Sequence, residues 1–150
     1  MKPPRVVFDT NIYIRKLLSS GGGGDKLFGL FVNRKIDLYT SKKQLEELIG
    51  VVLAINEEGR RHIDENDLLA LVTKLQKRAT FVASKRQNKL SPDPDDDWII
   101  GIAIKAKATH LISENPKDIR QDLIPKTLSL TVWKVKEALD AWLPRNEKNS

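Results

Sequence analysis

Carboxylates stand at three places where this chain passes from one predicted element to the next. Asp9 follows a short apolar run, Glu46 and Glu47 lie in the first turns of a predicted helix, and Asp97 begins an apolar helical stretch. Three carboxylates brought within a few ångströms repel one another, and a divalent cation relieves that repulsion. Oxygen ligands without histidine or cysteine select Mg²⁺ or Mn²⁺ over zinc. The acids therefore indicate a Mg²⁺ or Mn²⁺ site of the kind that hydrolyses phosphodiester bonds.

The acids before Asp97 have a plainer interpretation as the start of a helix. Asp93 followed by Pro94 is typical of an N-cap and a proline at the first helical position. Asp96 then falls at the third position, where acids suit the helix dipole. This interpretation absorbs Asp93, Asp95 and Asp96, and it leaves Asp97 on the apolar stripe of the helix. Asp97 is therefore the acid expected to face a neighbouring strand end.

Asp9 has the strongest claim to a functional role. The apolar residues 5–8 predict a strand, and residues 12–18 predict a helix directly after it. In an open parallel sheet the ligand crevice lies at the carboxyl ends of the strands, where Asp9 is expected. Helix capping would explain Thr10 and Asn11. An unpaired carboxylate closing a buried strand is costly, and it needs a partner or a metal.

The two neighbouring glutamates cannot be separated by this reasoning. Glu46 fits a solvent-exposed position near a helix start, whereas Glu47, beside the apolar stripe, is able to reach inward. Polar groups collect again after the predicted strand at residues 109–112, in the turn at residues 113–118.

Strands and helices alternate along the whole chain. Strands are predicted at residues 5–8, 36–39, 79–83, 109–112 and 128–132; helices are predicted at 12–18, 27–31, from 42 after the cap Ser41, at 64–76, from 94, and at 135–143. This alternation predicts an α/β sandwich with a mainly parallel sheet. Residues 19–24 are expected to form a flexible connection, because no Lys-Ser or Lys-Thr follows the glycines in phosphate-loop spacing.

Length and composition set the boundaries of the interpretation. The 150 residues, 40% of them hydrophobic, suffice for one core, so we expect one domain over residues 1–143 and a polar tail at 144–150. No cysteine is present, which excludes disulfides and thiolate zinc sites. No apolar run reaches 18 residues, so we expect a soluble, cytoplasmic protein without a membrane partner.

The formal charge of +6 favours a polyanionic partner such as RNA. Six basic residues lie between positions 74 and 89 with no acid among them, namely Lys74, Lys77, Arg78, Lys85, Arg86 and Lys89. A solvated helix face is the usual explanation for such a run. It is also the best candidate in the sequence for a patch that binds the RNA backbone.

Four segments in order give the chain a family resemblance. Residues 6–11, 41–48, 97–103 and 111–119 together resemble the PIN domain, over roughly the whole chain. The sequence looks closest to the bacterial and archaeal toxin components of toxin–antitoxin systems (VapC-like proteins), whose Asp-Pro-Asp-Asp-Asp stretch recurs at residues 93–97. The resemblance implies a three-layer α/β/α sandwich with a mainly parallel central sheet.

The resemblance also implies roles for individual residues. It makes Asp9, Glu47 and Asp97 the catalytic, metal-binding acids, with Glu46 and Asp96 as alternatives, and Thr10, Asn11 and Ser113 as groups that orient ligands or substrate. The fourth acid of the family falls at Asn115, where this chain has an amide. An amide carbonyl can still ligate a cation, but it contributes no charge, so a weakened second metal site is expected unless Asp118 substitutes.

Several functions remain open at this point. The preferred interpretation is a Mg²⁺- or Mn²⁺-dependent endoribonuclease, which the resemblance implies is a toxin, often a homodimer, silenced by an antitoxin. The alternative is a catalytically weak or inactive PIN-like module that binds RNA or a protein partner. A receiver-like signalling domain would have acids beside the first strand and a lysine after the last strand. Here Trp133-Lys134 follows the last predicted strand, which fits that pattern poorly. A nucleotide-binding dehydrogenase is disfavoured because a G-x-G-x-x-G turn is missing.

Overall fold

The computed structural model describes residues 2–83 and 94–144, without the side chains of residues 94–97. Its strands are β1 (Arg5–Phe8), β2 (Asp37–Thr40), β3 (Thr80–Phe81), β4 (His110–Ile112) and β5 (Thr131–Trp133). Its helices are α1 (Thr10–Leu18), α2 (Gly23–Val32), α3 (Lys42–Glu58), α4 (Glu65–Arg78), α5 (Pro94–Ala106) and α6 (Val135–Trp142), with the short 3-10 helices η1 (Pro116–Asp118) and η2 (Gln121–Leu123) after β4. None of the described helices is long and apolar enough to cross a membrane.

The strands form one sheet in the order β3-β2-β1-β4-β5, and each neighbouring pair is parallel. In the register of the central strand, Val6 lies opposite Leu38 of β2 and His110 of β4. The predicted parallel sheet is therefore confirmed. Because the strands run in one direction, all their carboxyl ends lie together at one end of the sheet, which we call the carboxyl end, and the opposite one is the amino end.

The last strand differs from the sequence prediction, which placed it at residues 128–132. Leu128 and Leu130 donate their backbone N–H groups within a turn, at 2.9 and 3.0 Å. Pairing begins only at Thr131, whose N–H donates to the Thr109 carbonyl at 2.9 Å. The strand therefore starts three residues later, where the chain comes alongside β4.

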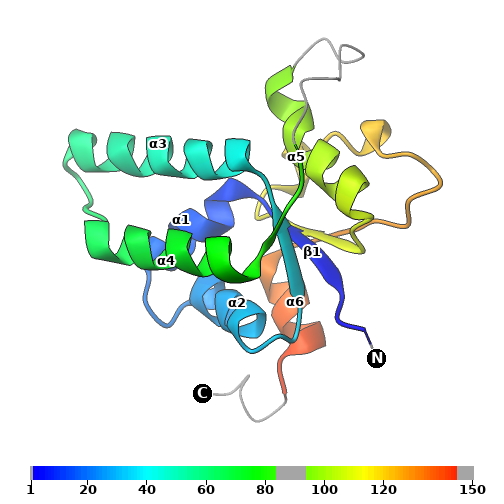
Figure 1. The fold of residues 1–150 in the computed structure, drawn as a ribbon, viewed down its shortest axis with the longest axis horizontal. Coiled ribbons are helices and arrows are strands. Elements are labelled where there is room, and N and C mark those ends of the chain that lie inside the picture. Colours follow the sequence, from blue (N-terminus) through cyan, green and yellow to red (C-terminus); the bar gives the residue numbers. More distant parts are fainter. Residues whose placement is uncertain (1, 84–93, 145–150) are drawn as a thin grey trace.

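Helices cover both faces of the sheet, which confirms the three-layer α/β/α sandwich (Figure 1). On one face lie α1, α2, α6 and the α3–α4 pair, around a core that includes Val6, Phe8 and Ile112. On the other face lies α5, and its Ile102 and Ala103 pack with the strand residues Val7 and Leu111. Successive residues of β1 thus serve opposite cores, as the alternation of side chains along a strand requires.

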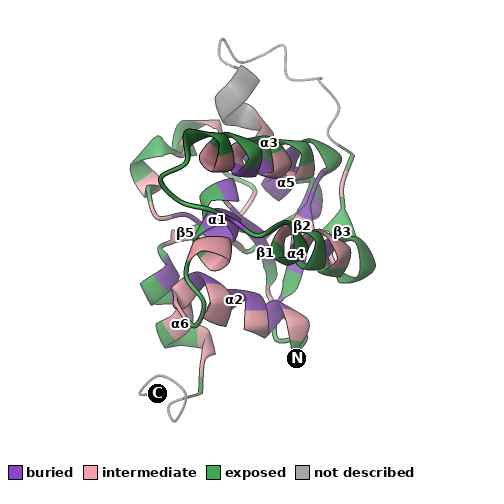
Figure 2. Cartoon of the chain, turned by 90° about the vertical axis from the view of Figure 1, so that its left-hand side faces the viewer, coloured by how far each residue is buried: buried purple, intermediate pink, exposed green. Residues whose placement is uncertain are grey.

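Helix α3 begins and ends with well-formed caps. The predicted cap at Ser41 is confirmed, because its hydroxyl accepts a hydrogen bond from the Gln44 N–H at 3.1 Å. The helix ends at Gly59, whose φ of +84° places it in the left-handed region. Asn56 then bonds both backbone groups of Ile63 and closes the turn into α4. The outward faces of α3 and α4 are largely exposed (Figure 2).

The predicted flexible connection at residues 19–24 is shorter than expected, because α2 already begins at Gly23. Gly24 is buried where α2 crosses α1. A Cβ at position 24 would lie 3.0 Å from the Lys16 nitrogen and 3.1 Å from the Ile12 carbonyl oxygen. The glycine is therefore needed for close helix packing and not for mobility.

Three aromatic rings fasten α6 to the sheet. His110 of β4 lies 4.5 Å from the Trp133 ring of β5 and 4.9 Å from the Trp142 ring of α6, between ring centroids. Burial against these rings lowers the pKa of His110, because it disfavours the charged imidazolium. The cluster therefore holds α6 in place with a neutral histidine at neutral pH.

Gly50 within α3 and Gly59 directly after it give predictions of opposite sign for the free energy of unfolding. A Cβ at either position would meet no atom within 4 Å, so the backbone conformation decides the effect. Gly59→Ala should lower the free energy of unfolding by about 1 kcal/mol, since it forces a side chain into the left-handed region. Gly50→Ala, in the exposed interior of the helix, should raise it by about 1 kcal/mol. Urea unfolding followed by circular dichroism measures both. A stabilising Gly59→Ala would contradict the assigned helix end.

Candidate active site

Asp9 lies at the carboxyl end of β1, and its N–H donates to the Ile112 carbonyl of β4 at 2.9 Å. It occupies the N-cap position of α1, yet its carboxylate accepts no capping hydrogen bond from this helix, all of which is described. The carboxylate instead accepts from the Ser113 hydroxyl, with 3.0 Å between Oγ and Oδ2. Aspartates at N-caps are ordinarily explained by the capping bond. That explanation does not account for Asp9.

Ser113 joins the carboxyl ends of three strands. It directly follows β4, its N–H donates to the Trp133 carbonyl of β5 at 2.9 Å, and its hydroxyl donates to Asp9, which directly follows β1. The same hydroxyl accepts from the Asn115 N–H at 3.1 Å. The side chain is fully buried. Ser113 therefore fixes both the Asp9 carboxylate and the turn that carries Asn115.

The structure distinguishes between the two neighbouring glutamates. Both are exposed on the first turns of α3. The Thr10 hydroxyl donates to Glu47, with 3.0 Å between Oγ1 and Oε2. Because Thr10 directly follows Asp9, this bond brings Glu47 to the residues that end β1. Glu46 lies about 100° further round the helix.

A buried glutamine connects these parts, and the sequence analysis did not identify it. Gln44 is 1% exposed, and its side-chain N–H donates to the Phe8 carbonyl at 2.6 Å and lies 3.5 Å from the Thr10 hydroxyl oxygen. Its side-chain oxygen accepts from the Thr40 hydroxyl. Thr10 in turn donates to Glu47. The polar chain therefore runs from the end of β2, past the end of β1, to the glutamate.

A signal for Gln44 was present in the sequence. Gln44 stands three positions before Glu47, so both lie on neighbouring parts of one helix face. It also falls on the side of α3 whose apolar members Leu48 and Val52 are buried. A polar residue within an apolar stripe needs buried partners. That pattern would have indicated a buried hydrogen-bond network.

The third predicted acid, Asp97, lies in the first turn of α5. Helix α5 is followed by the amino end of β4, so its first turn lies toward the carboxyl end of the sheet. The expected helix start at Pro94 is confirmed. The side chains of Asp95, Asp96 and Asp97, and the whole of Asp93, lie outside the description.

The other predicted site residues that the structure describes lie on the surface near Asp9 and Ser113. Asn11 is exposed on α1, and Asn115 and Asp118 are exposed at the two ends of η1. The backbone N–H of Asp118 donates to the Asn115 carbonyl at 2.9 Å. Asn115 and Asp118 therefore belong to one turn, which Ser113 connects to Asp9.

The described part of the predicted RNA-backbone patch lies elsewhere. Lys77 and Arg78 share a surface hollow with Pro3 and Ile36, which precede β1 and β2, so they lie at the amino end of the sheet. Arg78 is also engaged by the Val32 carbonyl, at 2.6 Å. Lys74 is exposed one turn earlier on α4, and Lys85, Arg86 and Lys89 lie outside the described residues. The described lysines are thus separated from Asp9 by the length of the sheet.

The oxygen groups at the carboxyl end suit a divalent cation. The carboxylates of Asp9 and Glu47 and the hydroxyls of Thr10 and Ser113 are joined by hydrogen bonds or adjacency, and oxygen donors of this kind are those that Mg²⁺ and Mn²⁺ prefer. Among the side chains that are described, no three histidines, cysteines or acids gather closely enough to hold a metal ion. The side chain of Asp97 is not among them.

Comparison with known proteins identifies the family. A family model of the PIN domain matches residues 5–117, from β1 into η1. The chain belongs to the PIN domain family. It is also similar to the uncharacterized protein MJ1680 of Methanocaldococcus jannaschii, with 29% identity over 116 residues that cover 77% of this chain and 72% of that protein. PIN domains are generally nucleases, so membership of this family indicates nuclease-type activity.

The Gln44 network gives a stability prediction. Gln44→Leu keeps the side-chain size but leaves the Phe8 carbonyl and the Thr40 hydroxyl without their buried partner. It should lower the free energy of unfolding by about 1–3 kcal/mol. The matched control is Gln76→Leu on the exposed face of α4, which should change it by less than about 0.5 kcal/mol. Equal effects in chemical denaturation would show that Gln44 contributes no more than a surface glutamine.

Proposed function

We propose that this PIN-domain protein is an endoribonuclease that requires Mg²⁺ or Mn²⁺ and uses Asp9, Glu47 and Asp97 as its catalytic acids. The observation that carries the proposal is the Asp9 carboxylate. It stands at a helix N-cap without capping the helix, and a fully buried serine holds it at the carboxyl end of the sheet. Ligands of open parallel sheets bind at that end.

Asp9, Glu47 and Asp97 are the residues that would hold the cation, with Asn115 or Asp118 as a further oxygen ligand. A bound divalent cation would neutralise the scissile phosphate and lower the pKa of the attacking water. The chain's own contribution is orientation: Ser113 fixes Asp9, and Thr10 fixes Glu47. Asn11, exposed next to Thr10, is available to contact the substrate.

A binding module without turnover is the second candidate, and Asn115 is the observation that favours it. Asn115 supplies no charge at the position where the family resemblance places an acid. Its backbone N–H is already bound to Ser113, and its side chain is exposed in the same turn as Asp118. RNA that binds without being cut in either Mg²⁺ or Mn²⁺ would favour this candidate over the nuclease.

A role as the toxin of a toxin–antitoxin pair belongs to the same proposal. It is supported by the resemblance of residues 93–97 to that class, and it implies a homodimer and a protein that silences the nuclease. Light scattering that gives the mass of a single chain of 17.0 kDa at all concentrations would remove the homodimer from the proposal.

The two adjacent glutamates provide the test. Glu47→Gln should lower the rate of RNA cleavage at least tenfold and weaken Mn²⁺ binding, since it removes a ligand charge. Glu46→Gln makes the same chemical change one residue away, outside the Thr10 hydrogen bond, and should retain activity. Cleavage of labelled single-stranded RNA and Mn²⁺ titration calorimetry measure both effects. Loss of activity in Glu46→Gln alone would show that Glu46 is the ligand and would contradict the role proposed for Glu47.

A further inference from the structure

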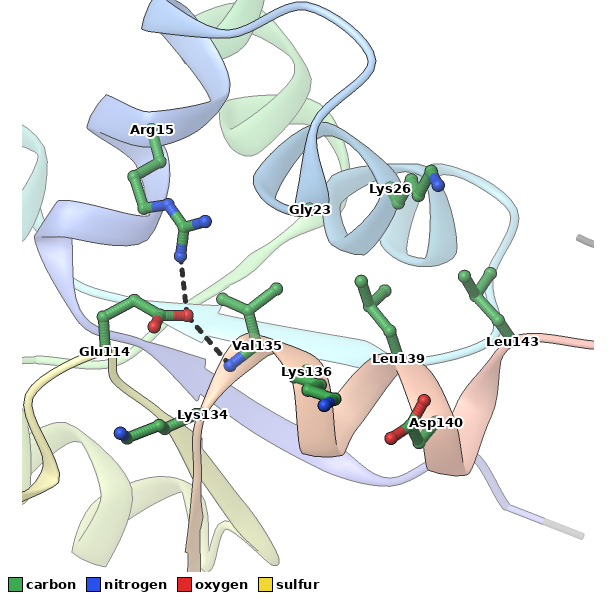
Figure 3. Close-up of a pocket in the computed structure, with 10 residues that line it drawn as sticks. All are labelled: Arg15, Gly23, Lys26, Glu114, Lys134, Val135, Lys136, Leu139, Asp140 and Leu143. Atoms are coloured by element: carbon green, nitrogen blue, oxygen red, sulfur yellow. Dashed lines mark hydrogen bonds and ion pairs between the residues drawn. The ribbon is translucent and has the colours of Figure 1, made fainter. Parts of the chain in front are cut away.

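A cavity of about 490 Å³ lies beside the candidate active site, between α2 and α6 (Figure 3). Arg15 of α1 and Glu114 lie at one end of it, and Gly23 and Lys26 of α2 face α6 across it. Its size falls within the range of ordinary ligand pockets. None of the residues assigned to the candidate active site lines it.

Glu114 connects this cavity to the candidate active site. It directly follows Ser113, whose hydroxyl holds Asp9. Its own carboxylate oxygen accepts from the Arg15 guanidinium at 2.6 Å and from the Val135 N–H at 3.1 Å (Figure 3). Ser113 therefore contacts Asp9, and the next residue, Glu114, lines the cavity, so the two sites are adjacent.

The lining of the cavity is predominantly basic. Four cationic side chains line it, from Arg15, Lys26, Lys134 and Lys136, against the two carboxylates of Glu114 and Asp140. Lys134 and Lys136 are exposed on either side of the start of α6. Positive charge in a hollow attracts polyanions, and lysine binds phosphate as a point charge.

One side of the cavity is apolar and closely packed. Val135 and Leu139 of α6, and Leu143 directly after it, point toward α2 (Figure 3). A Cβ at Gly23 would lie only 2.8 Å from Val135 Cγ1, so the two helices meet without room for another side chain. Val135 is buried in this contact, whereas Leu139 and Leu143 are partly exposed and form an apolar floor beside the cationic rim, a combination that suits a nucleoside with its phosphate.

We propose that this cavity binds the phosphodiester backbone of the RNA on one side of the cleaved bond, with Lys134 and Lys136 on phosphates and the apolar floor under a nucleoside. This inference rests on the proposed nuclease function. It gives the RNA a path from the carboxyl end of the sheet, where α6 begins, into the hollow between α2 and α6. The described lysines of α4 lie near the amino end, away from that path.

The test compares two double variants that each remove two positive charges. Lys134→Gln with Lys136→Gln alters the cavity, and Lys74→Gln with Lys77→Gln alters the exposed face of α4. The affinity for labelled single-stranded RNA is measured by fluorescence anisotropy, in EDTA to prevent cleavage, at several salt concentrations. The cavity variant should bind on the order of tenfold more weakly, and the slope of log affinity against log salt should fall by about 1.4. The α4 variant should match the wild type.

An unchanged affinity and salt slope in the cavity variant would overturn the proposal, and so would an equal loss in both variants. Cleavage by the wild type in Mn²⁺ is followed in parallel. If the wild type cleaves while the cavity variant keeps the wild-type affinity, the RNA path is wrong and the nuclease stands. If the wild type neither binds nor cleaves RNA, the proposed function itself fails.

Discussion

The hydrogen bond between Ser113 and Asp9 is the interaction on which the account of this molecule depends. A carboxylate at the end of a buried strand loses hydration, and it needs hydrogen bonds or a counter-charge to compensate. Here a fully buried hydroxyl supplies one bond, and the backbone of Asn115 holds that hydroxyl in turn. The bond is possible only because β1 and β4 are neighbours that end at the same end of a parallel sheet.

A second chain of hydrogen bonds approaches the same position from β2. Thr40 at the end of β2 donates to Gln44, and Gln44 donates to Thr10 after β1. Thr10 in turn donates to Glu47. Each donor has a matching acceptor, as a buried polar network requires. The fold therefore fixes two carboxylates through different partners. Carboxylates fixed in this way are available as oxygen ligands for a divalent cation.

Much of the fold could be predicted from local signals. Buried parallel strands appear as short apolar runs, which located β1, β2 and β4, and the cap at Ser41 and the proline at position 94 located two helix starts. The start of β5 could not be predicted, because its position depends on pairing with Thr109. The family resemblance preferred Glu47 over Glu46, but helix position alone could not separate them, and the bond from the Thr10 hydroxyl to Glu47 depends on the fold. The extent of the single domain and the role of Asp97 stay predictions.

Incubation of labelled single-stranded RNA with the wild type and with Asp9→Asn, in Mn²⁺, Mg²⁺ or EDTA, measures whether the Asp9 carboxylate takes part in metal-dependent cleavage. Asp9→Asn keeps the shape of the side chain and can still accept from Ser113, but it removes the charge that a cation needs. We expect cleavage by the wild type that requires the metal and disappears in the variant. Cleavage that persists in EDTA, or equal activity of the two proteins in Mn²⁺, would contradict the proposed role of the Asp9 carboxylate.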